Sequence, residues 1–188
     1  MASVRLVLAC LTLASALAGE PGIGARVGNL QLPDVSGQVH SLQSYAGRIV
    51  VLVFWSFKCP VSLSYDGRMT ALGHKYAGKQ VSVLAVASGA NETPEEIRAN
   101  VANLKIGMPV LLDSDGELAE KLGASHTPSV FILDGDGVVR YKGALDNNKK
   151  PGESGRIAYV EDALDALISG AAVALPETKA FGCSIKRR

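Results

Sequence analysis

Two near-continuous apolar runs constrain the fold of this chain more than any other feature. Residues 49–55, Ile-Val-Val-Leu-Val-Phe-Trp, contain no charged side chain, and residues 81–88, Val-Ser-Val-Leu-Ala-Val-Ala-Ser, are almost as apolar. Runs of this length that are rich in β-branched and aromatic residues are typical of strands buried on both faces. Because such strands need cover on each side of their sheet, the runs predict an α/β protein.

Helical patterns follow each of these runs. After the first run, apolar residues recur every three or four positions and predict one amphipathic helix: Val61, Tyr65, Met69, Leu72 and Tyr76. After the second run, Thr93-Pro94-Glu95-Glu96 has a capping residue, a proline at the first helical position and a glutamate that completes a capping box. A last amphipathic helix is expected over residues 157–167.

The sequence between the second and third long helices predicts further strands of the sheet and one short helix. A short strand is expected at 109–113 and a short helix near 116–122. Asp134-Gly135-Asp136-Gly137 separates two apolar runs and is a strong hairpin signal. The complete order predicts a central mixed β-sheet flanked by helices on both faces.

Composition narrows the possible partners. The 188 residues are 47% hydrophobic, enough for one domain with a sizeable core, and 19 basic residues nearly balance 18 acidic ones. The longest basic cluster is the terminal Lys186-Arg187-Arg188. This charge pattern does not favour nucleic acid as a partner.

The N-terminus has the pattern of an export signal. Residues 1–18 contain Arg5, then an uncharged apolar stretch, then Ala16-Leu17-Ala18, which predicts cleavage near Ala18. An uncleaved membrane anchor and a lipoprotein attached through Cys10 are the alternatives, and membrane association is expected only if the signal is not cleaved. The expected organisation is a signal peptide at 1–18, a domain at 25–170 and a tail at 171–188, in a periplasmic or extracellular protein.

Cleavage would leave Cys59 and Cys183 as the only cysteines, in a compartment where paired thiols tend to oxidise. Cys59 lies between a predicted buried strand and a predicted helix, where unpaired backbone N–H groups and the helix dipole stabilise a thiolate. Lys58 adds a neighbouring positive charge, and Ser62 lies one turn further on, where its hydroxyl can donate to the sulfur. These features predict a reactive thiol, and a buried inert cysteine is the alternative.

Two segments carry a family resemblance. "FWSFKCP" resembles the active-site segment of thioredoxins, Phe-Trp-Ala-x-Trp-Cys-x-x-Cys, and "HTPSVFILDGDGVVRYKG" resembles their cis-proline, strand and hairpin. The upstream "LPDVSGQVHSLQSYAGRIVVLVFW" is similar to the redoxin branch, which includes the alkyl hydroperoxide reductase and thiol-specific antioxidant proteins. The tail segment "GCSI" is similar to that of secreted redoxin-domain proteins that share a Cys-Pro-[Val/Ile]-[Ser/Ala] motif.

The resemblance covers roughly residues 25–170 and implies a thioredoxin-like fold with Cys59 as the nucleophile. It implies that Pro128 is a cis-proline opposite the thiol, so that the backbone of Thr127 can pair with an extended substrate chain. A trans-proline that begins a strand is the alternative. Trp55 is expected either in the core or in the substrate surface around Cys59.

The chain departs from both parent families at named positions. Ser62 stands where thioredoxins have their second cysteine. Peroxiredoxins have a proline where Leu52 stands and an arginine where alignment places Pro128, although Ser56 fills their hydroxyl position. Thr127-Pro128 therefore favours thioredoxin-type disulfide exchange.

A lone nucleophile can form a mixed disulfide, but a second thiol must resolve it. Ser62 cannot, which makes Cys183 the internal candidate. Three possibilities stay open: a resolving or structural pairing with Cys59, a pairing with another molecule's thiol, and a free structural cysteine.

The predicted function is thiol–disulfide exchange through Cys59 outside the cytoplasm, with protein or small-molecule thiols and disulfides as partners. The enzymatic alternative is a thiol-dependent peroxidase acting on hydroperoxides. A non-catalytic binding module, such as a Cu(I) carrier using Cys59 with His126 or Cys183, is the contrasting class. The pattern predicts neither a cofactor nor a resident metal.

Overall fold

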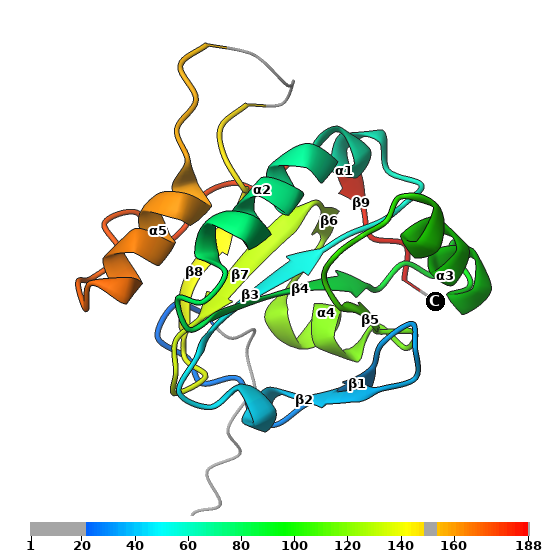
Figure 1. Cartoon of the computed structure of the whole chain (residues 1–188), viewed down its shortest axis with the longest axis horizontal. Coiled ribbons are helices and arrows are strands. Elements are labelled where there is room, and N and C mark those ends of the chain that lie inside the picture. The colour runs from blue at the N-terminus through cyan, green and yellow to red at the C-terminus, as the bar shows by residue number, and fades with distance from the viewer. Residues whose placement is uncertain (1–21, 149–153, 188) are drawn as a thin grey trace, which may run out of the picture.

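A five-stranded mixed sheet forms the centre of the computed structural model, which describes residues 22–148 and 154–187 (Figure 1). The strands lie in the order β5-β4-β3-β7-β8. The three that come first in the chain are parallel to one another, and the last two are antiparallel to their neighbours. Their bounds are β3 Ile49–Phe54, β4 Val81–Ala87, β5 Val110–Leu112, β7 Ser129–Leu133 and β8 Val139–Gly143.

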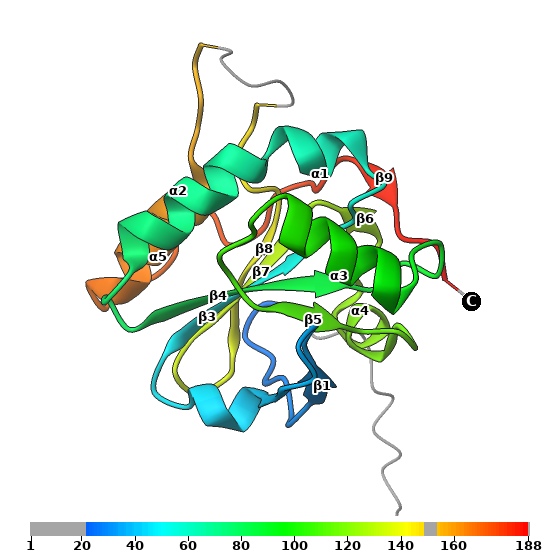
Figure 2. The same ribbon diagram turned by 45° about the vertical axis from the view of Figure 1, so that its right-hand side comes forward.

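The central strand β3 sends alternate side chains into two separate apolar clusters. Val51 and Val53 face a cluster completed by helices α2, α3 and α5, at Asp66–Tyr76, Pro94–Asn103 and Tyr159–Ile168. Leu52 and Phe54 face the opposite cluster, which α4 at Glu117–Leu122 and the N-terminal segment complete. Figure 2 shows α2 and α5 on one side of the sheet and α4 on the other. The predicted mixed sheet with helices on both faces is confirmed.

Short elements cover the sheet on the side of α4. A β1–β2 hairpin precedes a 3₁₀ turn, η1, and the hairpin lies beside β5 through an isolated bridge between Asp34 and Leu111. Leu32, Leu42 and Tyr45 from this region pack against the second apolar cluster. The bounds are β1 Gln31–Pro33, β2 Val39–Ser41 and η1 Leu42–Tyr45.

The first long helix was expected to be continuous, and the structure divides it at Tyr65. Helix α1, Pro60–Ser64, ends where the Tyr65 N–H donates to the Ser62 carbonyl at 2.8 Å, and α2 begins at Asp66. The Tyr65 hydroxyl is buried and donates to the Asp146 carboxylate at 3.0 Å. This buried hydrogen bond connects Tyr65 to the loop after β8. The local spacing of apolar residues contains no sign of such a distant contact, and it did not predict the break in the helix.

The other predicted starts agree well with the structure. Thr93 caps α3: its hydroxyl accepts from the Glu96 N–H at 3.2 Å, and the Glu96 carboxylate accepts from the Thr93 N–H at 2.8 Å. The capping box is therefore confirmed. The Asp134–Gly137 turn joins β7 to β8 as predicted, with Gly137 at a φ of +73°.

A buried ion cluster fixes the loop after β8. Asp146 has a fully buried side chain and accepts from Arg68 at 2.7 Å and from Arg156 at 2.9 Å. Burial acts to raise the pKa of the Asp146 carboxyl, but hydrogen bonds from Arg156, Arg68 and Tyr65 outweigh it and hold that pKa below its ordinary value. The Arg68 guanidinium also lies 3.6 Å from the centre of the Tyr65 ring.

Asp146→Asn is expected to lower the free energy of unfolding by about 2 kcal/mol at neutral pH, because charge-assisted hydrogen bonds to both guanidinium groups are lost. A carboxyl whose pKa is lower in the folded state stabilises the fold above its unfolded pKa of about 3.9, and the contribution disappears as the pH falls through the folded value. The difference in unfolding free energy between the wild type and the variant should therefore become smaller below about pH 4. Urea denaturation at several pH values measures it, with exposed Asp136→Asn as the control; an unchanged gap at low pH contradicts the prediction.

One sequence prediction, the proposed signal at 1–18, falls outside the described residues. Within residues 22–148 and 154–187, no helix has the length and apolarity needed to cross a membrane.

Candidate active site

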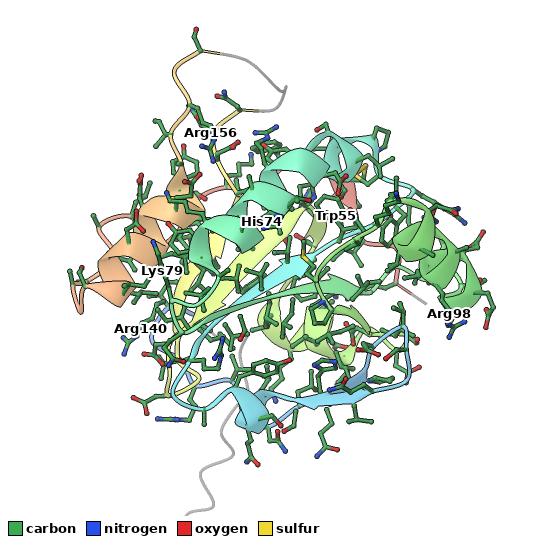
Figure 3. The ribbon with its side chains drawn as sticks, viewed as in Figure 1. Trp55, His74, Lys79, Arg98, Arg140 and Arg156 are labelled. Atoms are coloured by element: carbon green, nitrogen blue, oxygen red, sulfur yellow. A yellow bond between two sulfur atoms is a disulfide. The ribbon has the colours of Figure 1, made fainter. Side chains whose placement is uncertain are left out.

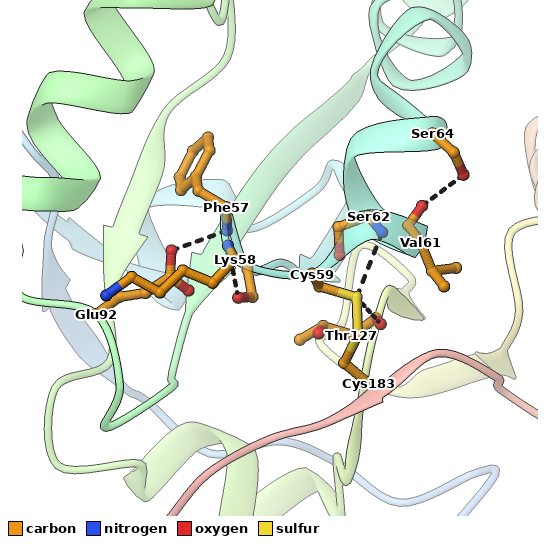
Figure 4. The surroundings of a disulfide bond; sticks show 10 residues. Phe57, Lys58, Cys59, Val61, Ser62, Ser64, Glu92, Thr127 and Cys183 are labelled. Atoms are coloured by element: carbon orange, nitrogen blue, oxygen red, sulfur yellow. Dashed lines mark hydrogen bonds between the residues drawn. A yellow bond between two sulfur atoms is a disulfide. The ribbon is translucent and has the colours of Figure 1, made fainter.

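Cys59 occupies the start of α1, directly after the loop that follows β3. Its backbone is extended, at a φ of −96° and a ψ of 112°, and Pro60 takes the first helical position. The Ser62 N–H donates to the Cys59 Sγ at 3.5 Å, as expected for a capping side chain (Figure 4). Only 1% of Cys59 is exposed.

The Thr127–Pro128 peptide bond is cis and lies against this sulfur. The Cys59 Sγ is 3.1 Å from the Thr127 carbonyl oxygen. A reduced thiol at this position can donate a hydrogen bond to that oxygen, whereas a thiolate or a disulfide sulfur cannot. The structure therefore brings together Cys59, Thr127 and Pro128, as the resemblance implied.

Cys183 lies on the other side of the same sulfur and forms a disulfide with Cys59, with the two Cα atoms 5.9 Å apart. Its short strand β9, Cys183–Ser184, pairs antiparallel with β6, His126–Thr127, and places Cys183 opposite Thr127. Both ribbon views show β9 beside β6, near α1 (Figures 1 and 2). Of the three possibilities left open for Cys183, the structure has the pairing with Cys59.

Glycine allows the tail to come this close. Gly182 has a φ of +142°, and a Cβ built there would lie 2.1 Å from the Thr127 carbonyl oxygen. Further back, a Cβ on Gly143 would lie 2.2 Å from the Thr178 Oγ1, so β8 also needs a glycine where the tail crosses it. Sequence reasoning missed both roles, because each depends on a contact between residues far apart in the chain.

Two neighbours of Cys59 differ from expectation. The Lys58 ammonium donates to Glu96 at 2.9 Å and to the Asn91 carbonyl at 2.7 Å, and Figure 4 shows it extending away from Cys59. Lys58 therefore does not place its charge at the sulfur, because the N-terminus of α3 supplies a closer acidic partner. The Ser62 hydroxyl is buried and has no hydrogen-bond partner among the residues that the structure describes, so its main-chain N–H, not its hydroxyl, contacts the sulfur.

Trp55 lies in the core at the end of β3, only 4% exposed, on the side of the sheet covered by α2 (Figure 3). It lines a small hollow with Phe57, Met69 and Met108, while the site around Cys59 is formed by other residues. Of the two roles considered for Trp55, the structure places it in the core. A contribution to the substrate surface stays a prediction.

Glu92 is a site neighbour that sequence reasoning missed. It is 8% exposed, and its carboxylate accepts from the Phe57 N–H at 2.9 Å, which fixes the loop that carries Cys59. The only sequence signal was a glutamate directly before the α3 cap, and that position has no periodicity to mark it. His126 contacts the Ser125 hydroxyl at 2.9 Å through its Nδ1.

No group of three or more His, Cys, Asp or Glu side chains arranged to hold a metal ion occurs within residues 22–148 and 154–187. A central mixed sheet, a cysteine at the start of the first long helix and a cis-proline against its sulfur together define a thioredoxin-like redox protein. Solved structures with the same fold include a thiol:disulfide interchange protein from Chlorobium tepidum, at a TM-score of 0.60 and 24% identity, over 65% of this chain and 85% of that one.

The particular family follows from the sequence. The AhpC/TSA family model matches residues 23–142, well over half of the chain, and the protein belongs to this family. The thiol-disulfide oxidoreductase ResA from Bacillus thuringiensis subsp. konkukian is 30% identical over 117 residues, which are 62% of this chain and 66% of that protein. This chain thus spans slightly less than two thirds of that relative.

Two further matches extend the comparison. The thiol:disulfide interchange protein DsbE from Tatumella citrea is 31% identical over 140 residues, 72% of this chain and 70% of that protein. A hypothetical protein from Sinorhizobium meliloti 1021 has a crystal structure with a TM-score of 0.80 and 27% identity, over 90% of this chain and 97% of that one.

Proposed function

We propose that the protein is a thiol–disulfide oxidoreductase in which Cys59 is the nucleophile and Cys183 resolves the mixed disulfide. The observation that carries this proposal is the position of the two sulfurs: Cys59 caps a helix beside a cis-proline, and Cys183 is bonded to it from a paired tail strand. Similarity to ResA and DsbE, both named for thiol–disulfide chemistry, supports the same reaction.

The reaction proceeds in two balanced exchanges. First, the Cys59 thiolate attacks one sulfur of a partner disulfide, a Cys59–partner disulfide forms, and the second partner sulfur leaves as a thiolate. Next, the Cys183 thiolate attacks Cys59, closes the Cys59–Cys183 bond and releases the partner's first sulfur. The partner gains two electrons, the protein loses two, and an external dithiol restores the protein.

The surrounding residues have positioning roles in this scheme. The Ser62 N–H, at 3.5 Å from the sulfur, stabilises negative charge on it when the disulfide opens. The buried Ser62 hydroxyl lies in the same turn and is not committed to another partner in the described chain, so it is available to donate to the thiolate. The Thr127 backbone and Pro128 shape the surface that a partner chain meets.

Export is part of the proposal. The signal-like residues 1–18 would direct a domain at 25–170 and a tail at 171–188 to the periplasm or the extracellular space. A disulfide between Cys59 and Cys183 suits such an oxidising compartment. Mass spectrometry of the mature protein tests cleavage near Ala18, and an intact N-terminus in a membrane fraction would contradict it.

Peroxidase activity is the second candidate, favoured by membership of the AhpC/TSA family. The geometry gives it less support, since the Lys58 ammonium pairs with Glu96 and does not place its charge at the Cys59 sulfur. Incubating the reduced protein separately with a protein disulfide, a hydroperoxide and Cu(I) distinguishes exchange, peroxidase and copper-carrier roles. Fast oxidation by the hydroperoxide alone would replace the exchange proposal.

The Cys59 thiol is expected to be more acidic than an unperturbed one, because the N-terminus of α1 stabilises its thiolate. On a Cys183→Ser background, the rate of alkylation by iodoacetamide should titrate with a midpoint below the ordinary value of about 8.5. Adding Ser62→Ala should move that midpoint upward if the hydroxyl donates to the thiolate. A Cys59→Ser protein, in which Cys183 is the remaining mature thiol, is the control, and a midpoint at or above 8.5 for Cys59 would exclude the activated thiol.

A further inference from the structure

The end of the tail fills a groove that begins at Cys59 and runs toward α4. Cys183 and Ser184 pair with β6, and the residues after them continue past the loop between β4 and α3. A hollow of about 260 Å³ remains beside Cys59 and Lys58. Main-chain hydrogen bonds hold the tail there: Ile185 N–H to the Ser125 carbonyl at 2.9 Å, and Ala90 N–H to the Lys186 carbonyl at 2.7 Å. Because these bonds use only the backbone, any extended chain in the same register could form them.

Side chains add requirements to that register. The residue before the cysteine must be glycine, since a Cβ on Gly182 would lie 2.1 Å from the Thr127 carbonyl oxygen. Two positions after the cysteine, Ile185 packs against the apolar cluster on the α4 side of the sheet. Arg187, four positions after the cysteine, lies in a second hollow of about 190 Å³ together with the acidic residues Asp115 and Glu120.

The tail must leave this groove for Cys59 to meet a partner, because Cys59 is almost completely buried while the tail is in place. Upstream of the groove the tail is tied to β8: the Thr178 N–H donates to the Lys142 carbonyl at 3.0 Å, and the Lys142 N–H donates to the Pro176 carbonyl at 3.0 Å. Reduction of the disulfide removes the only covalent link of residues 179–187 to the groove. Phe181 packs against Tyr65 and the apolar cluster around it, so residues 182–187, which follow Phe181, are the part that can withdraw.

We propose that the groove vacated by the tail binds a cysteine-containing extended segment of a partner protein in the register of the tail. The segment has glycine directly before its cysteine, an aliphatic residue two positions after it, and a basic residue four positions after it. This inference rests on the proposed function and names its substrate class. The tail then occupies the groove in the same way as the substrate segment. In the oxidised protein the tail therefore prevents the partner segment from binding there.

A set of three peptides tests this substrate class. The first is the tail segment Lys-Ala-Phe-Gly-Cys-Ser-Ile-Lys-Arg, the second replaces its glycine with valine, and the third replaces its last two residues with glutamate. Each carries 5-thio-2-nitrobenzoate on its cysteine. When the Cys59 thiolate of the reduced full-length Cys183→Ser protein attacks the peptide sulfur, a Cys59–peptide disulfide forms and the coloured thiolate leaves, so its release gives the rate.

We expect the tail peptide to react at least about tenfold faster than the valine peptide, because the added side chain meets the Thr127 carbonyl. The tail peptide should react about fivefold faster than the glutamate peptide at low salt, and this ratio of rates should fall at high salt. Asp115→Asn combined with Glu120→Gln should also narrow the charge-dependent gap. The variant's own tail competes equally with all three peptides, so the ratios are unaffected.

Three outcomes distinguish a failure of the proposed substrate class from a failure of the proposed exchange function. The expected ratios support the groove as the substrate site. Equal rates for all three peptides overturn this inference and leave the exchange chemistry of Cys59 in place. If neither the peptides nor the small disulfide 5,5′-dithiobis(2-nitrobenzoate) reacts with Cys59, the proposed function fails and the inference fails with it.

Discussion

A Cys183→Ser variant is expected to stop halfway through the exchange, as a mixed disulfide between Cys59 and its partner. Serine cannot attack a disulfide sulfur, and Ser62 cannot do so for the same reason. In the wild-type protein the resolving thiol is held at the site, with its Cα 5.9 Å from that of Cys59. Replacing this positioned thiol with dilute external thiol should lower turnover by about 100-fold or more. Non-reducing electrophoresis and intact-mass measurement detect the trapped adduct.

Two variants make this result specific. Cys59→Ser should form no adduct at all, because the nucleophile is missing. Ser184→Ala changes the exposed residue beside Cys183 in the same strand and should retain turnover without trapping. Wild-type turnover by Cys183→Ser, with no trapped intermediate, would assign resolution to an external thiol and leave Cys183 a structural role.

The sequence predicted the elements well wherever their causes are local. The burial of β3 on both faces follows from one apolar run, and the α3 cap depends on residues Thr93 to Glu96 alone. The division of the first helix at Tyr65 was not predictable in this way. The Tyr65 side chain at the break bonds to Asp146, 81 residues further along the chain, and no local pattern shows this contact.

The features of the active site also differ in whether their causes are local in the sequence. The placement of Cys59 at a strand-to-helix junction is local, and the sequence predicted it. The orientation of Lys58 depends on Glu96, 38 residues away, and the pairing of Cys183 with Thr127 depends on how the tail returns to the sheet. The sequence left a disulfide between Cys183 and Cys59 as one of three possibilities, because nothing near Cys183 encodes its partner.

Gly182→Ala is expected to weaken the Cys59–Cys183 disulfide without touching either sulfur. The added Cβ would lie 2.1 Å from the Thr127 carbonyl oxygen, and the φ of +142° is one that side chains rarely adopt. The tail can relieve the steric clash and the backbone strain only by moving off β6. This movement takes Cys183 away from Cys59. We expect the reduction potential to rise by at least about 30 mV, which corresponds to a tenfold change in the equilibrium constant. Equilibration with a dithiol buffer measures it.

Gly170→Ala is the matched control, because Gly170 has a φ of +75° but a Cβ there meets nothing within 4 Å in the described chain. It should lower stability through backbone strain, by about 1 kcal/mol, and leave the potential unchanged. A thermodynamic cycle gives an independent check. If the Gly182→Ala clash exists only while the tail is docked, the variant should lose more unfolding free energy when oxidised than when reduced. The difference between the two losses should equal the change in reduction potential multiplied by 2F, about 1.4 kcal/mol for 30 mV. Equal losses in both states would mean that the tail stays on β6 after reduction, and a vacated groove would then not exist.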